Sequence, residues 1–430
     1  MKILIHDGRV IDPASGRDET ADIAIAAGRI VAIGKVHADF TPDQRIDARG
    51  LVVAPGLVDL SARLREPGRD GMLETEMAAA VAGGITSLVC PPDTEPVLDE
   101  PGLVQMLKFR ARTLRRANLF PLGALTRGLR GEVLTEMTAL TEAGCIGFSQ
   151  AEHPIRDTLV LHRALQYAAT FGYATWLRPS DVWLGQGVAA KGALATRMGL
   201  SGVPVIAETI ALATIFELVR DTGARVHLCR LSSAAGIELV RRAKAEGLPV
   251  TADVSLNQLH LIDVDIGYFN AAMRLTPPLR QQRDRDAIRA ALADGCIDAL
   301  VSDHTPVDAD AKNLPFAEAE PGATGLELLL SLALKWGAEE GLSMPATLAT
   351  VTSGPVEVLG DALGSLAASA GRLVVGGVAD VCGFDPNAHW VVQPSALRSH
   401  GKHTPYAGYE LPARVRWTLV GGALAFDATA

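Results

Sequence analysis

The chain has 430 residues and a net charge of −9, and its 48% hydrophobic and 21% charged residues are typical of a globular protein with an ample core. The acidic balance gives no reason to expect binding to nucleic acid or to an anionic membrane, because both require a basic field. Apolar runs are too short to cross a bilayer, the N-terminus lacks a signal-peptide pattern, and five scattered cysteines form neither a disulfide framework nor a zinc knuckle. We therefore expect a soluble, cytoplasmic protein.

Both ends of the chain are predicted to form short strands separated by tight turns. The predicted strands are Lys2–His6, Arg9–Ile11, Ala21–Ala26 and Arg29–Ile33 near the start, and Arg372–Val375, Asp380–Phe384, His389–Val392 and Val415–Val420 near the end. Because the two ends share this pattern and the middle does not, we expect residues 1–53 plus 371–430 to build one small composite β-sandwich domain.

The middle of the chain, residues 54–370, alternates short apolar runs with helical patterns. There are eight such runs: Gly56–Leu60, Thr86–Cys90, Leu119–Leu125, Cys145–Ser149, Ala174–Leu177, Arg225–Cys229, Pro249–Val254 and Ala299–Ser302. A helix is predicted over Asp99–Arg116, with Asp99 as its N-cap, and another over Ile237–Ala245. This alternation is typical of an α/β fold with a parallel (β/α)8 TIM-like barrel, and the alternative is an open doubly wound sheet.

The first of these helices carries a basic run, which consists of Lys108, Arg110, Arg112, Arg115 and Arg116. A solvated outer face is the plainer interpretation of this run. The alternative is a surface that binds an acidic partner.

Several spaced motifs follow the predicted strands, where a barrel places its functional residues. They are Asp59 followed by Arg65-Glu66-Pro67-Gly68, then Gly83-Gly84-Ile85-Thr86, Pro277-Pro278-Leu279-Arg280, Ser302-Asp303-His304-Thr305-Pro306 and Gly325-Leu326-Glu327. In order and spacing, residues 51–334 resemble the dihydroorotase family of the amidohydrolase superfamily, in which a metal-bound hydroxide opens a cyclic amide. The resemblance implies an amidohydrolase-type barrel over residues 54–370.

The family's metal-binding positions carry other residues in this chain. Its two histidines after the first strand fall on Ser61 and Arg63, and the bridging carboxylate after the fourth strand falls on Gln150 or its neighbour Ala151. Its histidines after the fifth and sixth strands fall on Arg178 and Arg230.

Three further positions compare differently. The aspartate after the eighth strand is kept as Asp303, and Arg65 matches the arginine that binds the substrate carboxylate. The family's substrate-binding asparagine has become Asp93.

These substitutions predict that no zinc is bound. Zinc takes imidazole, thiolate or carboxylate ligands, whereas a guanidinium stays protonated and offers no lone pair. His227 and Cys229 lie two residues apart on a predicted buried strand, where packing is the plainer interpretation. We therefore expect a chain without a cofactor and an inactive homologue of the metal-dependent enzyme.

Three functions are consistent with this pattern. The resemblance implies a non-catalytic, dihydroorotase-like subunit with a structural role in pyrimidine biosynthesis, in complex with aspartate carbamoyltransferase, and a homo-oligomer. The first alternative is an active cyclic amidohydrolase of dihydroorotase, allantoinase or hydantoinase type with a remodelled site. The second is a protein that binds an anion or small molecule at an arginine-lined barrel mouth.

The retained aspartate has a structural consequence of its own. An unpaired carboxylate at the end of a buried strand costs several kcal/mol, so Asp303 requires a cation. We expect Arg63 to supply it, because the first and eighth strands of a closed barrel are neighbours. If Arg63 does not, Arg230 is the next candidate.

Overall fold

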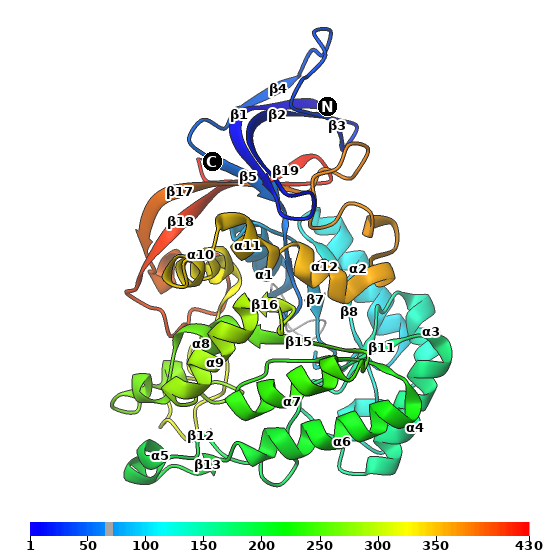
Figure 1. Ribbon diagram of the computed structural model, residues 1–430, viewed down its shortest axis with the longest axis vertical. Helices are drawn as coiled ribbons and strands as arrows, with labels where there is room; N and C mark the ends of the chain where they lie inside the picture. Colours follow the sequence, from blue (N-terminus) through cyan, green and yellow to red (C-terminus); the bar gives the residue numbers. More distant parts are fainter. Residues whose placement is uncertain (65–71, 430) are drawn as a thin grey trace.

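The computed structural model describes residues 1–64 and 72–429. Figure 1 shows a sheet domain that contains both chain ends, lying against a larger body of strands and helices. The predicted fold class, a (β/α)8 barrel with a sheet domain built from the termini, is confirmed. Among the described residues, no helix has the length and apolar character that a membrane crossing would require.

The strands of the sheet domain come from both ends of the chain. They are β1 (Lys2–Asp12), β2 (Arg17–Ala26), β3 (Arg29–Ile33), β4 (Gln44–Asp47), β5 (Val52–Pro55), β17 (Val381–Val391), β18 (Glu410–Val420) and β19 (Ala423–Asp427). Their order is β19-β18-β17-β5-β1-β2-β3, with β4 also paired to β1. The antiparallel pairing of β17 with β5 joins the two ends of the chain in one sheet.

Three details of this domain differ from the prediction. The predicted strands Lys2–His6 and Arg9–Ile11 are one strand, β1, whose pairing with β2 shifts between Ile5 and Gly8. The residues Arg372–Val375 form an irregular segment instead of a strand, in which Leu373 packs into the core beneath the sheet. The predicted strands Asp380–Phe384 and His389–Val392 are one strand, β17, whose pairing shifts between Asp385 and His389. The domain boundaries, 1–53 plus 371–430 and 54–370, stay predictions.

The predicted apolar runs of the middle segment become the barrel strands. They are β6 (Leu57–Asp59), β7 (Ile85–Cys90), β8 (Asn118–Pro121), β9 (Gly123–Ala124), β10 (Phe148–Ser149), β11 (Ala174–Leu177), β14 (Arg225–Leu228), β15 (Val250–Ser255) and β16 (Ala299–Val301). The run Leu119–Leu125 is split into β8, which pairs with β7, and β9, which pairs with β10. A parallel bridge between Ala62 and His304 connects the β6 side to the β16 side, which closes the barrel.

Helices cover the outside of this barrel. They are α1 (Met72–Ala82), α2 (Pro101–Leu114), α3 (Met137–Ala143), α4 (Thr158–Phe171), α6 (Ile206–Thr222), α7 (Ala234–Ala245), α8 (Leu256–His260), α9 (Gln282–Ala293), α10 (Leu329–Glu339), α11 (Met344–Ala349) and α12 (Ser353–Leu359). Between β11 and α6 the chain adds β12 (Ala189–Ala190), α5 (Ala193–Met198) and β13 (Gly202–Val203).

The start of α2 also differs from the prediction. Its N-cap is Glu100, and Pro101 stands in the first turn, where a missing N–H costs nothing. Asp99 instead accepts a hydrogen bond from the backbone N–H of Gly128 at 2.7 Å. Its carboxylate therefore joins two loops at the end of the barrel and does not cap the helix.

Candidate functional site

A cavity of about 580 Å³ opens at the carboxyl ends of the barrel strands. Glu320 lies in its lining, and six further charged side chains come from loops after six different strands: they are Arg63, Asp93, Glu152, Arg178, Arg230 and Asp303. We call these six side chains the mouth cluster. Because the strands are parallel, residues far apart in sequence meet at this one end of the barrel.

Glu152 is the centre of the mouth cluster. Its carboxylate pairs with Arg63 at 2.9 Å and also with Arg178 and Arg230. Burial alone would raise the pKa of Glu152, but the charges of Arg178, Arg230 and Arg63 outweigh burial and hold that pKa well below its usual range. Glu152 therefore stays ionised, and it binds three guanidinium groups together.

Asp303 is paired mainly by Arg230. The Nη1 atom of Arg230 donates to Oδ1 of Asp303 at 3.0 Å, whereas the nearest nitrogen of Arg63 is 4.0 Å away. The predicted Arg63–Asp303 ion pair is therefore present, but the second candidate, Arg230, makes the closer contact. The reason is that Arg63 is already held by Asp93 at 2.8 Å and by Glu152.

The pKa of Asp303 lies above its ordinary value. Burial is the largest cause and raises it; the positive charges of Arg230 and Arg63 lower it, and the negative charge of Glu152 raises it again. A carboxyl group with a raised pKa exchanges protons closer to neutral pH than a normal aspartate does. Asp303 is therefore the described residue of the mouth cluster best suited to proton transfer.

Two predicted site residues lie outside the mouth cavity, and a third is not described. Ser61 is buried below the mouth, where its N–H donates to the Asp59 carboxylate at 3.3 Å. Gln150 exchanges hydrogen bonds with Thr126 and does not line the mouth cavity. Arg65 lies outside the described residues.

Sequence reasoning missed Glu152. Its position two residues beyond Gln150 places it in the loop after β10, and a carboxylate in such a loop is the signal that could have found it. The three arginines and three carboxylates of the mouth cluster are also balanced in charge, and Glu320 adds a further carboxylate to the cavity lining. This balance weakens the prediction of an anion-binding pocket, because no surplus positive charge faces the cavity.

The mouth positions do not fit a zinc ion, because Ser61, Arg63, Arg178 and Arg230 cannot supply imidazole, thiolate or carboxylate ligands. A different donor set lies one residue deeper. His227, Cys229 and Asp253 offer ligand atoms that all lie within 4.8 Å of one another. These donors do fit zinc in chemical type, as an imidazole, a thiol and a carboxylate.

This donor set, which we call the deep triad, is directly connected to the mouth cluster. The backbone N–H of Arg230 donates to Oδ1 of Asp253 at 2.7 Å, and Oδ2 of the same carboxylate lies 2.9 Å from His227 Nε2. The other ring nitrogen of His227 lies 2.8 Å from the Thr251 hydroxyl. Burial is the main cause that raises the pKa of the Cys229 thiol, so a metal ion would have to displace its proton.

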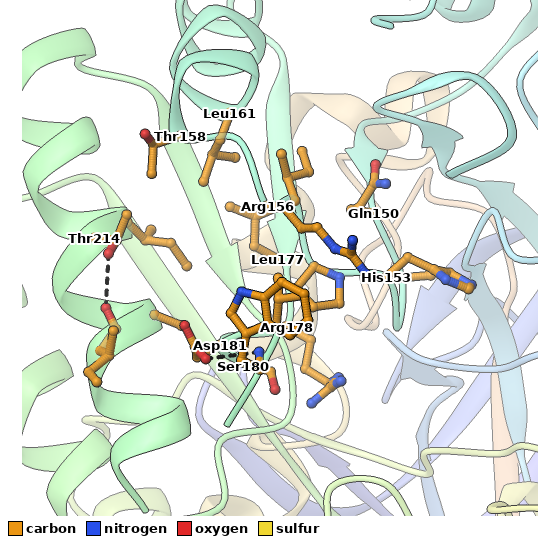
Figure 2. Close-up of a pocket in the computed structure, with 18 residues that line it drawn as sticks. Gln150, His153, Arg156, Thr158, Leu161, Leu177, Arg178, Ser180, Asp181 and Thr214 are labelled. Carbon is orange, nitrogen blue, oxygen red and sulfur yellow. Dashed lines mark hydrogen bonds between the residues drawn. The ribbon is translucent and has the colours of Figure 1, made fainter. Parts of the chain in front are cut away.

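A second, smaller pocket adjoins the mouth cavity, with which it shares His153 and Arg178. Figure 2 shows it between α4 and α6, where Leu161 and Thr214 line opposite walls. The Arg156 guanidinium lies 4.8 Å from the centre of the exposed Trp183 ring. The pocket is mainly apolar, in contrast to the charged mouth.

Comparison with known proteins identifies the family of the chain. The profile of a family described as Dihydro-orotase-like matches residues 50–235. A Dihydroorotase-like protein of Pseudomonas aeruginosa is 46% identical over 99% of this chain and 100% of its own length. The chain belongs to the dihydroorotase-like family.

Other relatives carry the name dihydroorotase. That of Trichlorobacter lovleyi is 37% identical over 99% of this chain and 100% of its own length, and that of Geobacter sp. strain M21 is 36% identical over 100% of both. Among solved structures, the L-hydantoinase from Arthrobacter aurescens superposes with a TM-score of 0.86 at 24% identity, covering 99% of this chain and 96% of that one. This likeness supports the amidohydrolase barrel fold.

Two predictions from the sequence are contradicted by these findings. The prediction of an inactive homologue is contradicted because relatives that match the whole chain are named dihydroorotase. The prediction of a chain without a metal is contradicted because His227, Cys229 and Asp253 form a group that could hold an ion. The donors lie on two neighbouring strands, β14 and β15, and the sequence does not specify how these strands align.

Proposed function

We propose that this chain is a cyclic amidohydrolase of the dihydroorotase type with a remodelled site. Its substrate is a small cyclic amide that carries a carboxylate. The observation that supports this most is the mouth cavity itself, where Asp303 lies together with three arginines, one of which, Arg230, is hydrogen-bonded to Asp253 of the deep triad. The family of the chain and the names of its full-length relatives agree with this assignment.

Hydrolysis of a ring amide adds the oxygen of water to the carbonyl carbon, breaks the ring C–N bond and gives one proton to the leaving nitrogen. Asp303 is the group that accepts the proton of water and returns it to nitrogen, because its raised pKa favours both steps. Arg63 and Arg230 flank this carboxylate at 4.0 and 3.0 Å, so their charge stabilises negative charge that develops on the carbonyl oxygen.

Binding of the substrate falls to the outer part of the mouth. Arg178 pairs with Glu152 at the edge of the cavity and is more exposed than Arg63 and Arg230. A planar guanidinium binds a carboxylate through two parallel hydrogen bonds, so Arg178 is the group we expect to hold the substrate carboxylate. Because the charges of the mouth cluster are balanced, the substrate carboxylate must replace part of the contact between Arg178 and Glu152.

The deep triad is the set that would hold a zinc ion. When bound, zinc acidifies a water molecule and polarises a carbonyl group. His227 would have to exchange its hydrogen bond with Asp253 for the metal, while Thr251 keeps the orientation of the imidazole ring through its other nitrogen.

The test uses the purified full-length chain, loaded with zinc, and follows ring opening of dihydroorotate, which carries a carboxylate, and of hydantoin and allantoin, which do not. We expect turnover of dihydroorotate in preference to the other two, and a loss of about 100-fold or more in kcat for Asp303→Asn. The matched control is Asp361→Asn, which alters an exposed aspartate on the sheet-domain side. Absence of dihydroorotate turnover would show the proposal to be wrong.

A separate measurement tests the deep triad. Zinc content is determined for the wild type and for His227→Ala and Cys229→Ser, after removal of free metal. We expect about one zinc ion per wild-type chain and a large loss in both variants. Equal zinc content in all three proteins would exclude the triad as the ligand set.

We also propose the association with aspartate carbamoyltransferase, together with a homo-oligomeric state, which the family resemblance implies. Activity and association are compatible, since consecutive enzymes of one pathway can share a complex. Size-exclusion chromatography of the chain, alone and with that enzyme from the same host, tests both points. Elution of this chain at 45.2 kDa in both runs would contradict both the homo-oligomeric state and the association.

A further inference from the structure

The basic run of α2 borders a groove of about 480 Å³ that is separate from the mouth. Asn118, which opens β8, lies in its lining, so the groove is at the amino ends of the strands and therefore at the opposite end of the barrel. Figure 1 shows α2 beside the segment that follows α12, and residues of that segment, Leu363 and Leu366, form another wall. The sheet domain contributes Val420 and Ala423.

The charges of this groove are all of one sign. Four cationic side chains, Lys108, Arg112, Arg115 and Arg116, line it, and its described lining contains no aspartate or glutamate. The Lys108 ammonium donates to the Gly144 carbonyl oxygen at 3.1 Å, and Arg116 donates to the carbonyl oxygen of Ala425. These bonds hold two cations in place without neutralising them.

Lys108 is the most buried of these four cations, and its pKa lies below the ordinary lysine value. Burial is the largest cause that lowers the pKa of Lys108, the Cys145 thiol opposes it, and the charge of Arg112 lowers it further. Arg112 and Arg115 are exposed, and Arg115 has a left-handed backbone at the end of the helix, where φ is 50°. The chain as a whole carries a net charge of −9, so this local surplus of cations is not a feature of its general surface.

The groove also offers apolar contacts. Its floor contains Leu119, Phe120 and Leu366. On the outer surface of α2, Phe109 is 73% exposed and stands one helical turn before Arg112. Phe109 is not in the groove lining but lies beside it, and an exposed aromatic side chain next to arginines is a composition found at the energetic centres of protein interfaces.

We infer that this groove binds an acidic segment of a partner protein, with apolar side chains placed between its carboxylates. Carboxylates contact Arg112 and Arg115, and an apolar side chain packs against Phe109. A small polyanion could use the cations but would leave Phe109 and the apolar floor exposed. This inference is independent of the proposed hydrolytic function, because the groove shares no residue with the mouth cluster.

The test is a fluorescence polarisation titration of the full-length chain with a labelled peptide that alternates glutamate and leucine. The reference peptide has glutamine in place of glutamate. We expect the glutamate peptide to bind, and Arg112→Glu combined with Arg115→Glu to weaken that binding by about tenfold or more. Phe109→Ser should weaken it as well, and added salt should weaken it in the wild type.

The matched control is Arg163→Glu, which reverses an exposed arginine on α4 and should leave the affinity unchanged. Thermal unfolding of each variant checks that the fold is kept. Equal binding of the two peptides, or unchanged binding in the double variant, would overturn the inference. Inorganic pyrophosphate is titrated in parallel: if the double variant loses pyrophosphate binding while its peptide affinity is unchanged, the groove is a site for small anions and the inference is wrong.

Discussion

The mouth cluster and the α2 groove both contain several arginines, but the arginines are paired with carboxylates in the mouth and with no described carboxylate in the groove. In the mouth, Arg63, Arg178 and Arg230 each contact Glu152, and Asp93 and Asp303 complete the balance. In the groove, Arg112 and Arg115 face a described lining without a carboxylate. Charges that a fold buries must be paired inside the molecule, whereas charges left unpaired at a surface are available to a partner.

The largest test of this comparison removes the centre of the mouth cluster. Glu152→Gln leaves three arginines close together without their shared counter-charge, so we expect the free energy of unfolding to fall by about 3 kcal/mol. Urea denaturation at neutral pH measures the change. Glu217→Gln is the control: it removes an exposed carboxylate paired with Arg220, and should cost less than about 0.5 kcal/mol. Equal losses in the two variants would show that the mouth pairs are no stronger than surface pairs.

A second test concerns a buried cation on the mouth side that is held mainly by a carbonyl group. The Lys312 ammonium donates to the Arg274 carbonyl oxygen at 2.8 Å. Burial is the main cause that lowers the pKa of Lys312 to about 7, Arg274 lowers it further, and Glu320 raises it.

The sign of the pH dependence follows from this shift. Between pH 7 and the ordinary lysine pKa of 10.5, the unfolded chain binds a proton that the folded chain does not. Stability should therefore rise with pH, by about 2 kcal/mol between pH 7 and pH 9. Lys312→Met should remove this slope in urea denaturation. A slope that persists in the variant would assign the pH dependence to another group.

A third test asks whether the mouth requires guanidinium geometry or only positive charge. Arg63 contacts Asp93, Glu152 and the Thr305 hydroxyl through different nitrogens. A lysine ammonium keeps the charge but cannot reach these groups at once, so Arg63→Lys should cost about 1–2 kcal/mol in urea denaturation. Arg163→Lys, on the outer surface of α4, should cost almost nothing. A neutral effect at Arg63 would mean that charge alone is sufficient.

The fold could be predicted from the sequence because each buried strand appears as a run of apolar residues. The apolar runs Ala174–Leu177 and Arg225–Cys229 match β11 and β14 to within one residue. Where the prediction was wrong, tertiary contacts decided the outcome. The apolar run Leu119–Leu125 is divided into two strands at Leu122, because β8 and β9 pair with different neighbours. Leu373 is apolar because it packs beneath the sheet and not because it lies in a strand.

The candidate site could be predicted only in part. Arg63, Arg230 and Asp303 could be predicted because each follows the end of a strand, and the strands fix where such residues lie in a barrel. Glu152 lies in an irregular loop and has no periodic signal. The contact of His227 with Asp253 joins two strands whose alignment the sequence does not specify. The pairing of each arginine with a particular carboxylate depends on side-chain geometry, which the sequence does not specify either.

The smallest effect on the free energy of unfolding is expected for an arginine of the α2 groove. Because Arg112 is exposed and repels Lys108, replacing it should not cost the fold a stabilising pair; Arg112→Glu should change the free energy of unfolding by less than about 0.5 kcal/mol. The same variant should weaken binding of the glutamate-leucine peptide, since it places a negative charge on the binding surface. Urea denaturation and peptide titration of one preparation measure both quantities. A loss of stability as large as that of Glu152→Gln would show that the groove arginines serve the fold, and the contrast between the two regions would then disappear.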